Sequence, residues 1–203
     1  MVDSASGDLI MTAAHCITGH AAGMVFAPGY LDGAAPYGTW IVTSAYVPAA
    51  WSDDTDPDYD FVILSVTPAS TNPTDAPVQA VVGGNRLGLA PTVGELVTVA
   101  GYAAGRDDAP VICSTTTYLT GRYPTFDCAG YVEGTSGSPW IADFDPATGQ
   151  GMIVALIGGL HQGGCSPDTS YSAPFTADTA QLLQSAADEG LGDDLPLTPD
   201  DGC

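Results

Sequence analysis

Short runs of apolar and β-branched residues follow one another along most of the chain. Val, Ile, Thr and aromatic side chains are frequent in these runs, and Gly, Pro, Asp and Asn stand between them, as is typical of short strands joined by turns. The predicted strands cover residues 9–12, 24–27, 39–47, 61–66, 78–82, 96–102, 111–119, 140–142 and 152–160. The pattern therefore predicts an all-β fold, either a sandwich or a barrel.

One segment, residues 176–189, has the pattern of a helix. Thr176 can act as its N-cap, Leu182 and Leu183 provide an apolar stripe, and Gly190 can end it. This C-terminal helix is expected to pack on the outside of the strands.

The connection between residues 68 and 77 is the least strand-like part of the chain, because Pro and small polar residues fill it. It predicts a crossover between two halves of the fold. We therefore expect an N-terminal unit at residues 1–80 and a C-terminal unit, which includes the helix, at 81–190. Residues 191–203 are acidic and contain proline, so they are predicted to form a tail.

The composition narrows the classes of partner. The chain has 203 residues, with 24 acidic side chains against 3 basic ones and a net charge of −21. Such a chain repels phosphate backbones and anionic membrane surfaces, so neither nucleic acid nor a membrane is an expected partner. Hydrophobic residues make up 45% of the chain, enough for a sizeable core. No apolar run approaches the ~20 residues that a membrane-spanning helix needs.

Five cysteines in an acidic, lysine-free chain favour disulfides and an oxidising compartment. Five thiols cannot all pair with one another. The first residues lack the basic start, apolar core and cleavage site of a signal peptide. Either one thiol is free or the chain lacks its beginning, and the sequence alone leaves both open. The cysteines are Cys16, Cys113, Cys128, Cys165 and Cys203.

Three local sequences carry candidate chemistry. His15 stands in Thr-Ala-Ala-His-Cys after a short apolar strand, and Asp60 comes directly before the apolar run Phe-Val-Ile-Leu. Ser136 lies in the tight turn Gly-Thr-Ser-Gly-Ser-Pro. Taken singly, each is ordinary: a structural histidine, a turn aspartate and a Gly-Ser turn.

Together, and in the order His, Asp, Ser, these motifs resemble the trypsin-like (chymotrypsin-fold) serine proteases. The Thr-Ala-Ala-His-Cys match is nearly verbatim, and the resemblance runs from about residue 7 to residue 189. It implies two antiparallel Greek-key β-barrels with a C-terminal helix, with His15 and Asp60 on the first barrel and Ser136 on the second. Ser136 would be the nucleophile, His15 the general base and Asp60 the acid that orients it, without a cofactor. The backbone N–H groups of Gly134 and Ser136 would form the oxyanion hole.

One position departs from the animal trypsins. The aspartate that precedes the nucleophilic serine in those enzymes is Thr135 here. The chain therefore looks more like the secreted bacterial branch that includes V8-type glutamyl endopeptidases. The segment at residues 126–131 resembles actinobacterial members most.

The resemblance also suggests which residues contact the substrate. Gly130 stands where trypsins carry the aspartate of the pocket floor, so recognition of Lys or Arg is not expected. His161 matches the His-x-Gly-Gly of V8-type enzymes, which favours an acidic residue before the scissile bond, although His161 could equally be a plain pocket-wall residue. The substrate backbone would add as a strand along residues 159–161. The predicted substrate contacts are Gly130, Tyr131, Glu133, Gly159, Leu160 and His161.

Acidic residues crowd the approach to Asp60, at Asp53, Asp54, Asp56 and Asp58. They lack the glycine and distal glutamate of an EF-hand loop, so a solvated loop is expected rather than a Ca²⁺ site. Asp58 is the rival for the triad acid. The chain has no metal-binding or nucleotide-binding motif.

In the family that the chain resembles, the cysteine after the catalytic histidine pairs with one about a strand upstream. Cys16 has no cysteine before it. Cys113 and Cys128 bracket a loop before the serine, as a family disulfide does, and Cys165 and Cys203 remain as a further pair. We therefore expect a chain truncated at its N-terminus, without its signal peptide and the opening strand of the first barrel.

These expectations combine into one function. The leading hypothesis is a secreted, monomeric bacterial serine endopeptidase that acts on peptides or proteins. The alternatives are a catalytically inactive binding or adhesion module on the same fold, and an esterase.

Overall fold

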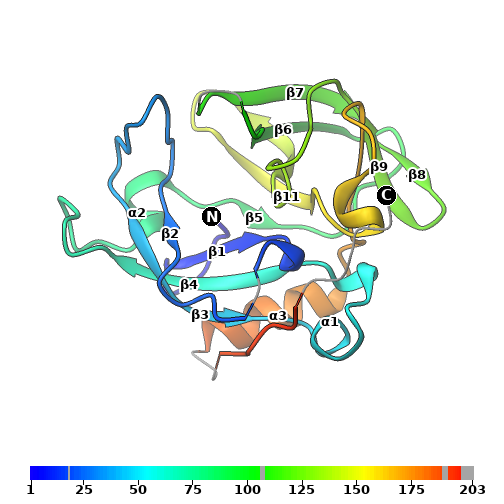
Figure 1. The fold of residues 1–203 in the computed structure, drawn as a ribbon. Helices are drawn as coiled ribbons and strands as arrows, with labels where there is room; N and C mark the ends of the chain where they lie inside the picture. Colours follow the sequence, from blue (N-terminus) through cyan, green and yellow to red (C-terminus); the bar gives the residue numbers. More distant parts are fainter. Residues whose placement is uncertain (18, 106–107, 189–191, 198–203) are drawn as a thin grey trace.

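Strands are the main regular secondary structure of the chain, and one longer helix lies near the C-terminus (Figure 1). The computed structural model describes residues 1–17, 19–105, 108–188 and 192–197. The predicted all-β class with a C-terminal helix is confirmed. Among the described residues, no helix is long and apolar enough to cross a membrane.

The N-terminal half forms a four-stranded antiparallel sheet in the order β1-β4-β3-β2. Its strand β4 is apolar at almost every position because both of its faces are covered. Val62, Leu64 and Val66 belong to one core cluster, and Ile63 belongs to another that includes residues of the C-terminal helix. The strands are β1 (Leu9–Thr12), β2 (Val25–Phe26), β3 (Trp40–Tyr46) and β4 (Val62–Pro68).

The C-terminal half has two sheets, one of five strands in the order β5-β11-β10-β6-β7 and one of three in the order β12-β9-β8. Val97, Val99, Phe126 and Trp140 are fully buried between them. Their pairings are antiparallel except that of β5 with β11. The strands are β5 (Arg86–Leu87), β6 (Leu96–Tyr102), β7 (Pro110–Thr116), β8 (Tyr118–Thr120), β9 (Tyr123–Asp127), β10 (Pro139–Asp145), β11 (Gln150–Leu156) and β12 (Thr169–Tyr171).

Helix α3 (Ala177–Ala187) is the helix that the sequence predicts. Thr176 caps its N-terminus in a capping box with Thr179. Ala186 joins a core cluster with residues of β1 and β4, so the last helix of the chain packs on the N-terminal half. Gly190, the predicted stop, lies outside the described residues.

Three strand predictions need correction. Residues 78–82 form helix α2 (Val78–Val82), because Val78, Val81 and Val82 have helical spacing and pack on the core together. The predicted strand at 111–119 is divided into β7 and β8. The strand predicted to reach residue 160 ends at Leu156, shortly before Gly158 and Gly159. The sequence also missed helix α1 (Ala49–Asp54) and the short strands β5, β9 and β12.

The predicted acidic tail is not a free tail over its described part. Residues 192–197 lie against the N-terminal half, and Leu195 is only 5% exposed. An apolar side chain in this acidic segment can join the core, which the proline and aspartate content of the sequence obscured.

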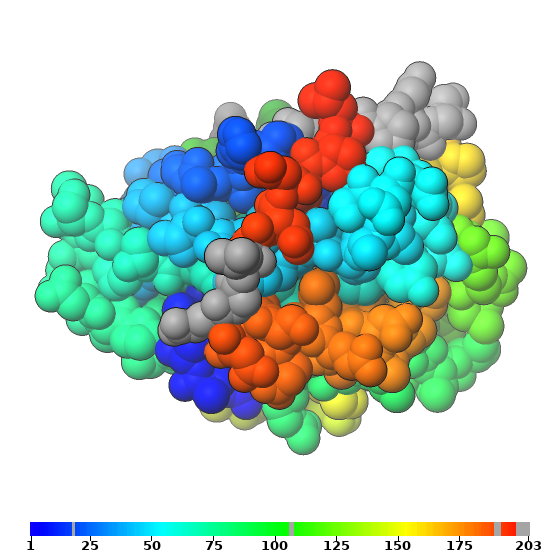
Figure 2. All heavy atoms as spheres, turned by 90° about the horizontal axis from the view of Figure 1, so that it is seen from below, coloured from blue at the N-terminus to red at the C-terminus, as the bar shows by residue number. Residues whose placement is uncertain are grey.

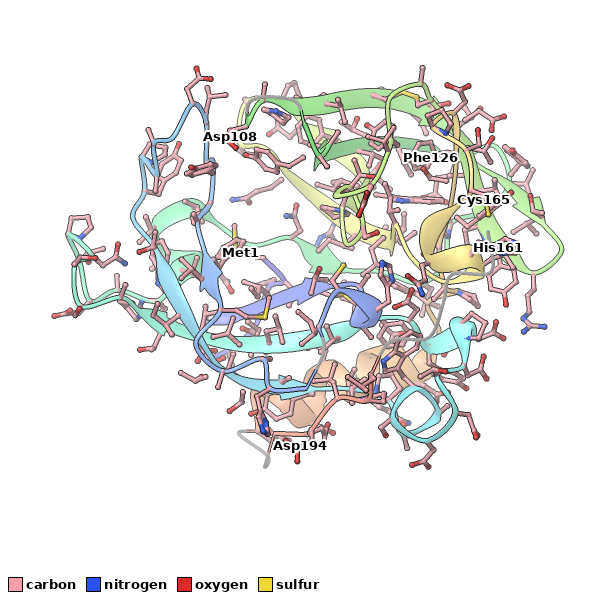
Figure 3. All side chains as sticks on the ribbon, viewed as in Figure 1. Met1, Asp108, Phe126, His161, Cys165 and Asp194 are labelled. Atoms are coloured by element: carbon pink, nitrogen blue, oxygen red, sulfur yellow. A yellow bond between two sulfur atoms is a disulfide. The ribbon has the colours of Figure 1, made fainter. Side chains whose placement is uncertain are left out.

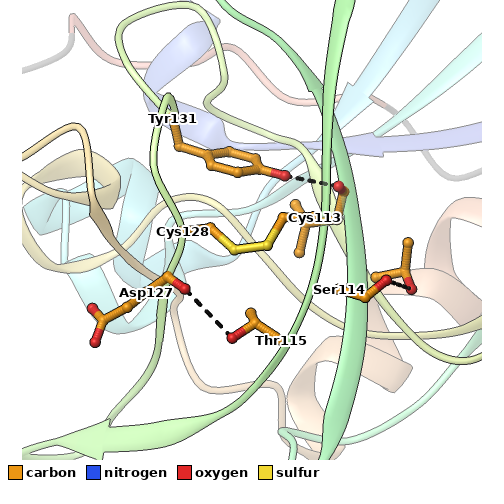
Figure 4. The surroundings of a disulfide bond; sticks show 8 residues. Cys113, Ser114, Thr115, Asp127, Cys128 and Tyr131 are labelled. Atoms are coloured by element: carbon orange, nitrogen blue, oxygen red, sulfur yellow. Dashed lines mark hydrogen bonds between the residues drawn. A yellow bond between two sulfur atoms is a disulfide. The ribbon is translucent and has the colours of Figure 1, made fainter.

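One disulfide is present among the described residues, between Cys113 in β7 and Cys128 after β9 (Figure 4). This pairing was predicted and is confirmed. Cys203, the predicted partner of Cys165, lies outside the described residues. Cys16 is an exposed free thiol.

Candidate active site

His15 lies in a short 3-10 helix, η1 (Ala14–Cys16), immediately after β1. Ala13 and Ala14 are completely buried, so only small side chains fit immediately before His15. The His15 side chain itself is 8% exposed, with its ring at the edge of a cavity. The small residues of the motif therefore bring the histidine backbone close to the core.

Asp60 ends the 3-10 helix η2 (Pro57–Tyr59) and is completely buried at the entrance to β4. Its Oδ2 atom lies 2.7 Å from the His15 Nδ1 atom and accepts a 2.7 Å hydrogen bond from the Gly159 N–H. Its Oδ1 atom accepts a 2.9 Å bond from the His15 backbone N–H. Because β1 pairs with β4, residues 45 positions apart in sequence meet here.

The surroundings of His15 change its pKa. Burial alone lowers the pKa of the imidazole. The hydrogen bond and negative charge of Asp60, together with the neighbouring Cys16 sulfur, outweigh burial and raise the pKa of His15 to about 10. The imidazolium is therefore strongly stabilised in the free protein.

Ser136 lies in a turn between two glycines in the left-handed region, Gly134 at φ +90° and Gly137 at φ +80°. A Cβ atom at Gly134 would lie 2.9 Å from the Ala104 N atom, so any side chain there would collide with backbone. A Cβ atom at Gly137 would lie 3.1 Å from the Ala13 N atom. The serine turn therefore packs closely against the segment that carries His15.

The same turn leaves two backbone donors unused. The Gly137 N–H donates to the Ile157 carbonyl, and the Thr135 N–H to the Val132 carbonyl. By contrast, the N–H groups of Gly134 and Ser136 donate no hydrogen bond to any residue that the structure describes. Two free donors beside a serine suit an oxygen that develops negative charge.

A cavity of about 600 Å³ brings the candidate groups together. His15 and Ser136 line it, as do three of the six predicted substrate contacts, Tyr131, Glu133 and His161. Its outer wall includes the turn after β11, and Figure 3 shows His161 and Cys165 near each other there.

The other three predicted contacts, Gly130, Gly159 and Leu160, do not line this cavity. The Gly159 N–H is used by Asp60, and Leu160 opens a 3-10 turn, η3 (Leu160–Gly163). His161 within that turn is left-handed, at φ +49°. Residues 159–161 thus do not form the extended strand that was predicted to pair with a substrate.

Tyr131 lines the cavity, but its hydroxyl is turned into the core. Its ring is 4% exposed and packs edge-on against Phe126, with centroids 5.2 Å apart. Its hydroxyl donates a 2.8 Å hydrogen bond to the Val99 carbonyl (Figure 4), and burial raises the pKa of Tyr131 to about 12. The hydroxyl serves the core and is not offered to a substrate.

Ser170 is a cavity residue that the sequence reasoning missed. It lies in β12, is 2% exposed, and lines the cavity. Its hydroxyl makes no hydrogen bond with any described residue. Only a strand prediction at 169–171 followed by its sheet pairing could have pointed to it, because one serine in a polar loop carries no signal of its own.

The acidic residues before Asp60 do not gather into a cation site. Asp56 accepts the Asp58 N–H, and Asp58 forms an ion pair with Arg122 at 2.6 Å. Among the described residues, no group of three His, Cys, Asp or Glu side chains could hold a metal ion. Asp58, the rival for the triad acid, pairs with Arg122 and makes no described contact with His15.

A buried Asp–His pair beside a serine turn, in a cavity of a mostly antiparallel β fold, is the arrangement of chymotrypsin-like serine peptidases. The chain belongs to the trypsin-like peptidase domain family, whose model matches residues 2–149. It is therefore a hydrolase of the serine endopeptidase class, with peptides or proteins as substrates. No curated protein sequence matches the chain.

Solved structures share the fold. The protease Anisep from Arthrobacter nicotinovorans has a TM-score of 0.74 and 23% identity, over 92% of this chain and 86% of that chain. A Glu endopeptidase has a TM-score of 0.69 and 18% identity, over 93% and 83%. Human heparin binding protein has a TM-score of 0.67 and 16% identity, over 95% and 86%. The last is named for binding, so the fold alone does not decide the activity.

Proposed function

We propose that the protein cleaves peptide bonds with a triad of Ser136, His15 and Asp60. The observation that supports this most is the buried Asp60 carboxylate, which lies 2.7 Å from the His15 Nδ1 atom while His15 and Ser136 line one cavity. A carboxylate in this place fixes the imidazole with its proton on Nδ1, so that Nε2 is the nitrogen that accepts a proton.

The residues would act in sequence. The Ser136 Oγ atom attacks the carbonyl carbon as His15 Nε2 takes the hydroxyl proton, and Asp60 stabilises the imidazolium. The Gly134 and Ser136 N–H groups bind the oxyanion of the tetrahedral intermediate. His15 then gives its proton to the leaving amine, and an acyl-enzyme remains on Ser136. A water molecule, deprotonated by His15, releases the acid product by the same steps in reverse.

A fluorophosphonate probe and a peptide substrate test this proposal. We expect the folded protein to be labelled and to hydrolyse the peptide, and Ser136→Ala to abolish both. Ser138→Ala, two residues away in the same turn, is the matched control and should remain labelled. Folded protein without labelling would support the inactive binding module. Turnover of esters without turnover of peptides would support an esterase.

We further propose that the cavity prefers an acidic residue before the scissile bond. His161 is on the cavity wall, and an imidazole N–H can donate a hydrogen bond to a carboxylate. Ser170 lines the same cavity, and its hydroxyl can donate a second hydrogen bond. Glu133 on the same cavity opposes this preference electrostatically, so the two donors must outweigh it.

Three peptides that differ only before the scissile bond, with Glu, Gln or Phe, test this preference. We expect the Glu peptide to have the highest kcat/KM, and Ser170→Ala to lower it about 10-fold or more, since a hydrogen bond to a charged group contributes about 1.5–3 kcal/mol. Ser166→Ala is the control, because the Ser166 hydroxyl lines the same cavity but accepts the Asp168 N–H. Equal or better turnover of the Phe peptide would refute the preference.

We also propose that the protein is a secreted monomer with units at residues 1–80 and 81–190. The Cys113–Cys128 disulfide supports an oxidising compartment, and the first sheet ends at Pro68, before the proposed boundary. Size-exclusion chromatography with light scattering checks the monomer, and fractionation of the native host checks secretion.

A further inference from the structure

Residues 192–197, which we name the C-terminal strap, follow helix α3 and cross the surface of the N-terminal half. Figure 2 shows this red segment lying next to the cyan part of the chain. Asp193 makes the first set of contacts that hold the strap in place. Its N–H donates a 2.7 Å hydrogen bond to the Ala45 carbonyl, and its Oδ2 atom accepts a 2.9 Å bond from the Val47 N–H.

The second fastening is at Leu195. The Leu195 N–H donates a 3.3 Å hydrogen bond to the Gly19 carbonyl, and the two residues form an isolated antiparallel bridge. The Leu195 side chain, 5% exposed, belongs to the core cluster that contains Ile17, Ala21 and Trp51. By contrast, Leu197 two residues later is 83% exposed.

The two fastenings lie on the two segments that hold the candidate catalytic pair. Ile17 follows His15 by two residues, and its N–H closes the η1 turn on the Ala14 carbonyl. Val47 directly follows β3. From there the chain continues through helix α1 and η2 to Asp60. The strap thus ties the segment after His15 to the segment that leads to Asp60.

We propose that the strap is a positioning device for the catalytic histidine and that Leu195 is a positioning residue. This rests on the proposed function of His15. Burial of Leu195 in the core cluster of Ile17, together with its bond to Gly19, would fix the backbone that follows His15, and through it the direction of the imidazole towards Asp60 and Ser136. A displacement of about 1 Å in a catalytic group costs up to about 10²-fold in rate.

The test compares Leu195→Ala with Leu197→Ala, the same change at an exposed position of the same strap. We expect Leu195→Ala to lower kcat about 10- to 100-fold with KM changed less than about 3-fold. Leu197→Ala should match the parent, and Leu195→Met should recover most of the rate. Circular dichroism and active-site titration establish that each variant is folded and report its active fraction.

A pH profile separates positioning from simple loss of folded protein. Asp60 and Cys16 are the titratable groups that act on His15. When Leu195→Ala loosens the His15–Asp60 contact, the rising limb of kcat/KM moves to lower pH, whereas a smaller folded fraction lowers the profile without moving it. If Leu195→Ala does not fold, Asp193→Ala gives the same test, because it removes an exposed anchor without opening the core.

The proposal is overturned if folded Leu195→Ala keeps kcat within about 2-fold and an unmoved pH profile, or if Leu197→Ala is equally impaired. The proposal is also overturned if Leu195→Ala or Asp193→Ala lowers the rate without shifting the pH profile of kcat/KM. If instead Ser136→Ala hydrolyses peptides as the parent does, the proposed triad is refuted, and this failure is distinct from a failure of the strap proposal.

Discussion

Asp60→Asn is the sharpest perturbation of the candidate site, since it keeps the size of the side chain and removes its charge. The Asp60 Oδ2 atom faces two donors, the His15 Nδ1–H and the Gly159 N–H, both at 2.7 Å. If the asparagine carbonyl stays on the His15 backbone N–H, its NH₂ group faces both of them. The imidazole must then move its proton to Nε2 so that Nδ1 can accept.

With its proton on Nε2, His15 cannot take a proton from Ser136. We expect kcat to fall about 10⁴-fold, as loss of the orienting carboxylate does in the known triads, which corresponds to about 5 kcal/mol of barrier. The buried Gly159 N–H loses its partner, which costs stability about 1–3 kcal/mol. Removing a buried charge offsets part of that cost.

The assay is turnover of a peptide substrate with enzyme counted by active-site titration, alongside urea unfolding. Asp58→Asn is the matched control, because Asp58 is two residues away and bound to Arg122 rather than to His15. It should keep kcat within about 3-fold. If Asp60→Asn keeps activity within 10-fold of the parent while Ser136→Ala is inactive, Asp60 does not orient the histidine.

Four further predictions concern His15, Tyr131 and the disulfide. Catalysis needs neutral His15, whose pKa is raised to about 10, so kcat/KM should rise with pH into the alkaline range, and Cys16→Ala should move that rise to lower pH; an unmoved profile would contradict the role of the Cys16 sulfur. Because the pKa of His15 is raised in the folded state, its pairing with Asp60 contributes stability that is fully present below pH 6.5 and is lost as pH rises to about 10. Urea unfolding midpoints at several pH values check this, and a midpoint that does not fall over this range would contradict it. Tyr131→Phe should cost about 1 kcal/mol in urea unfolding and leave selectivity between Glu and Phe peptides unchanged, since its hydroxyl bonds to a buried carbonyl; a changed selectivity would place that hydroxyl in the cavity. Replacing Cys113 and Cys128 together by alanine should cost about 3 kcal/mol for a cross-link of 15 residues, and an unchanged urea midpoint would contradict this.

The parts of the site that the sequence predicts are those tied to strand ends. His15 follows β1 and Asp60 precedes β4, and antiparallel pairing of these two strands brings the two residues together. Both motifs are short and local, with small residues beside His15 and an apolar run after Asp60. The resemblance of these motifs to the trypsin-like family could therefore point to this pair from the sequence.

The cavity wall was less predictable because loops form it. From residue 157 to residue 164 the backbone follows glycines with positive φ, at Gly159, Gly163 and Gly164, and even His161 is left-handed. Glycine permits these angles but does not require them. The glycines therefore do not show from the sequence where the strand ends, and the apolar run before them predicts a longer strand. The direction of the Tyr131 hydroxyl was unpredictable for a related reason: a tyrosine that lines a pocket can turn its hydroxyl into the core, and only packing decides which way it points.

Asp58 and Asp60 show why two carboxylates two positions apart can have different roles. Asp60 is completely buried and faces three N–H donors, so its charge is compensated and its geometry is fixed. The Asp58 side chain is 23% exposed and pairs with Arg122, whose side chain is 63% exposed. A solvent-exposed ion pair contributes little to stability and does not fix the position of either side chain. A charge held by buried hydrogen-bond donors, by contrast, can orient a neighbouring side chain. The apolar residues that follow Asp60 cause this difference, because β4 is buried on both faces and the two residues before it, Asp60 and Phe61, enter the core with it.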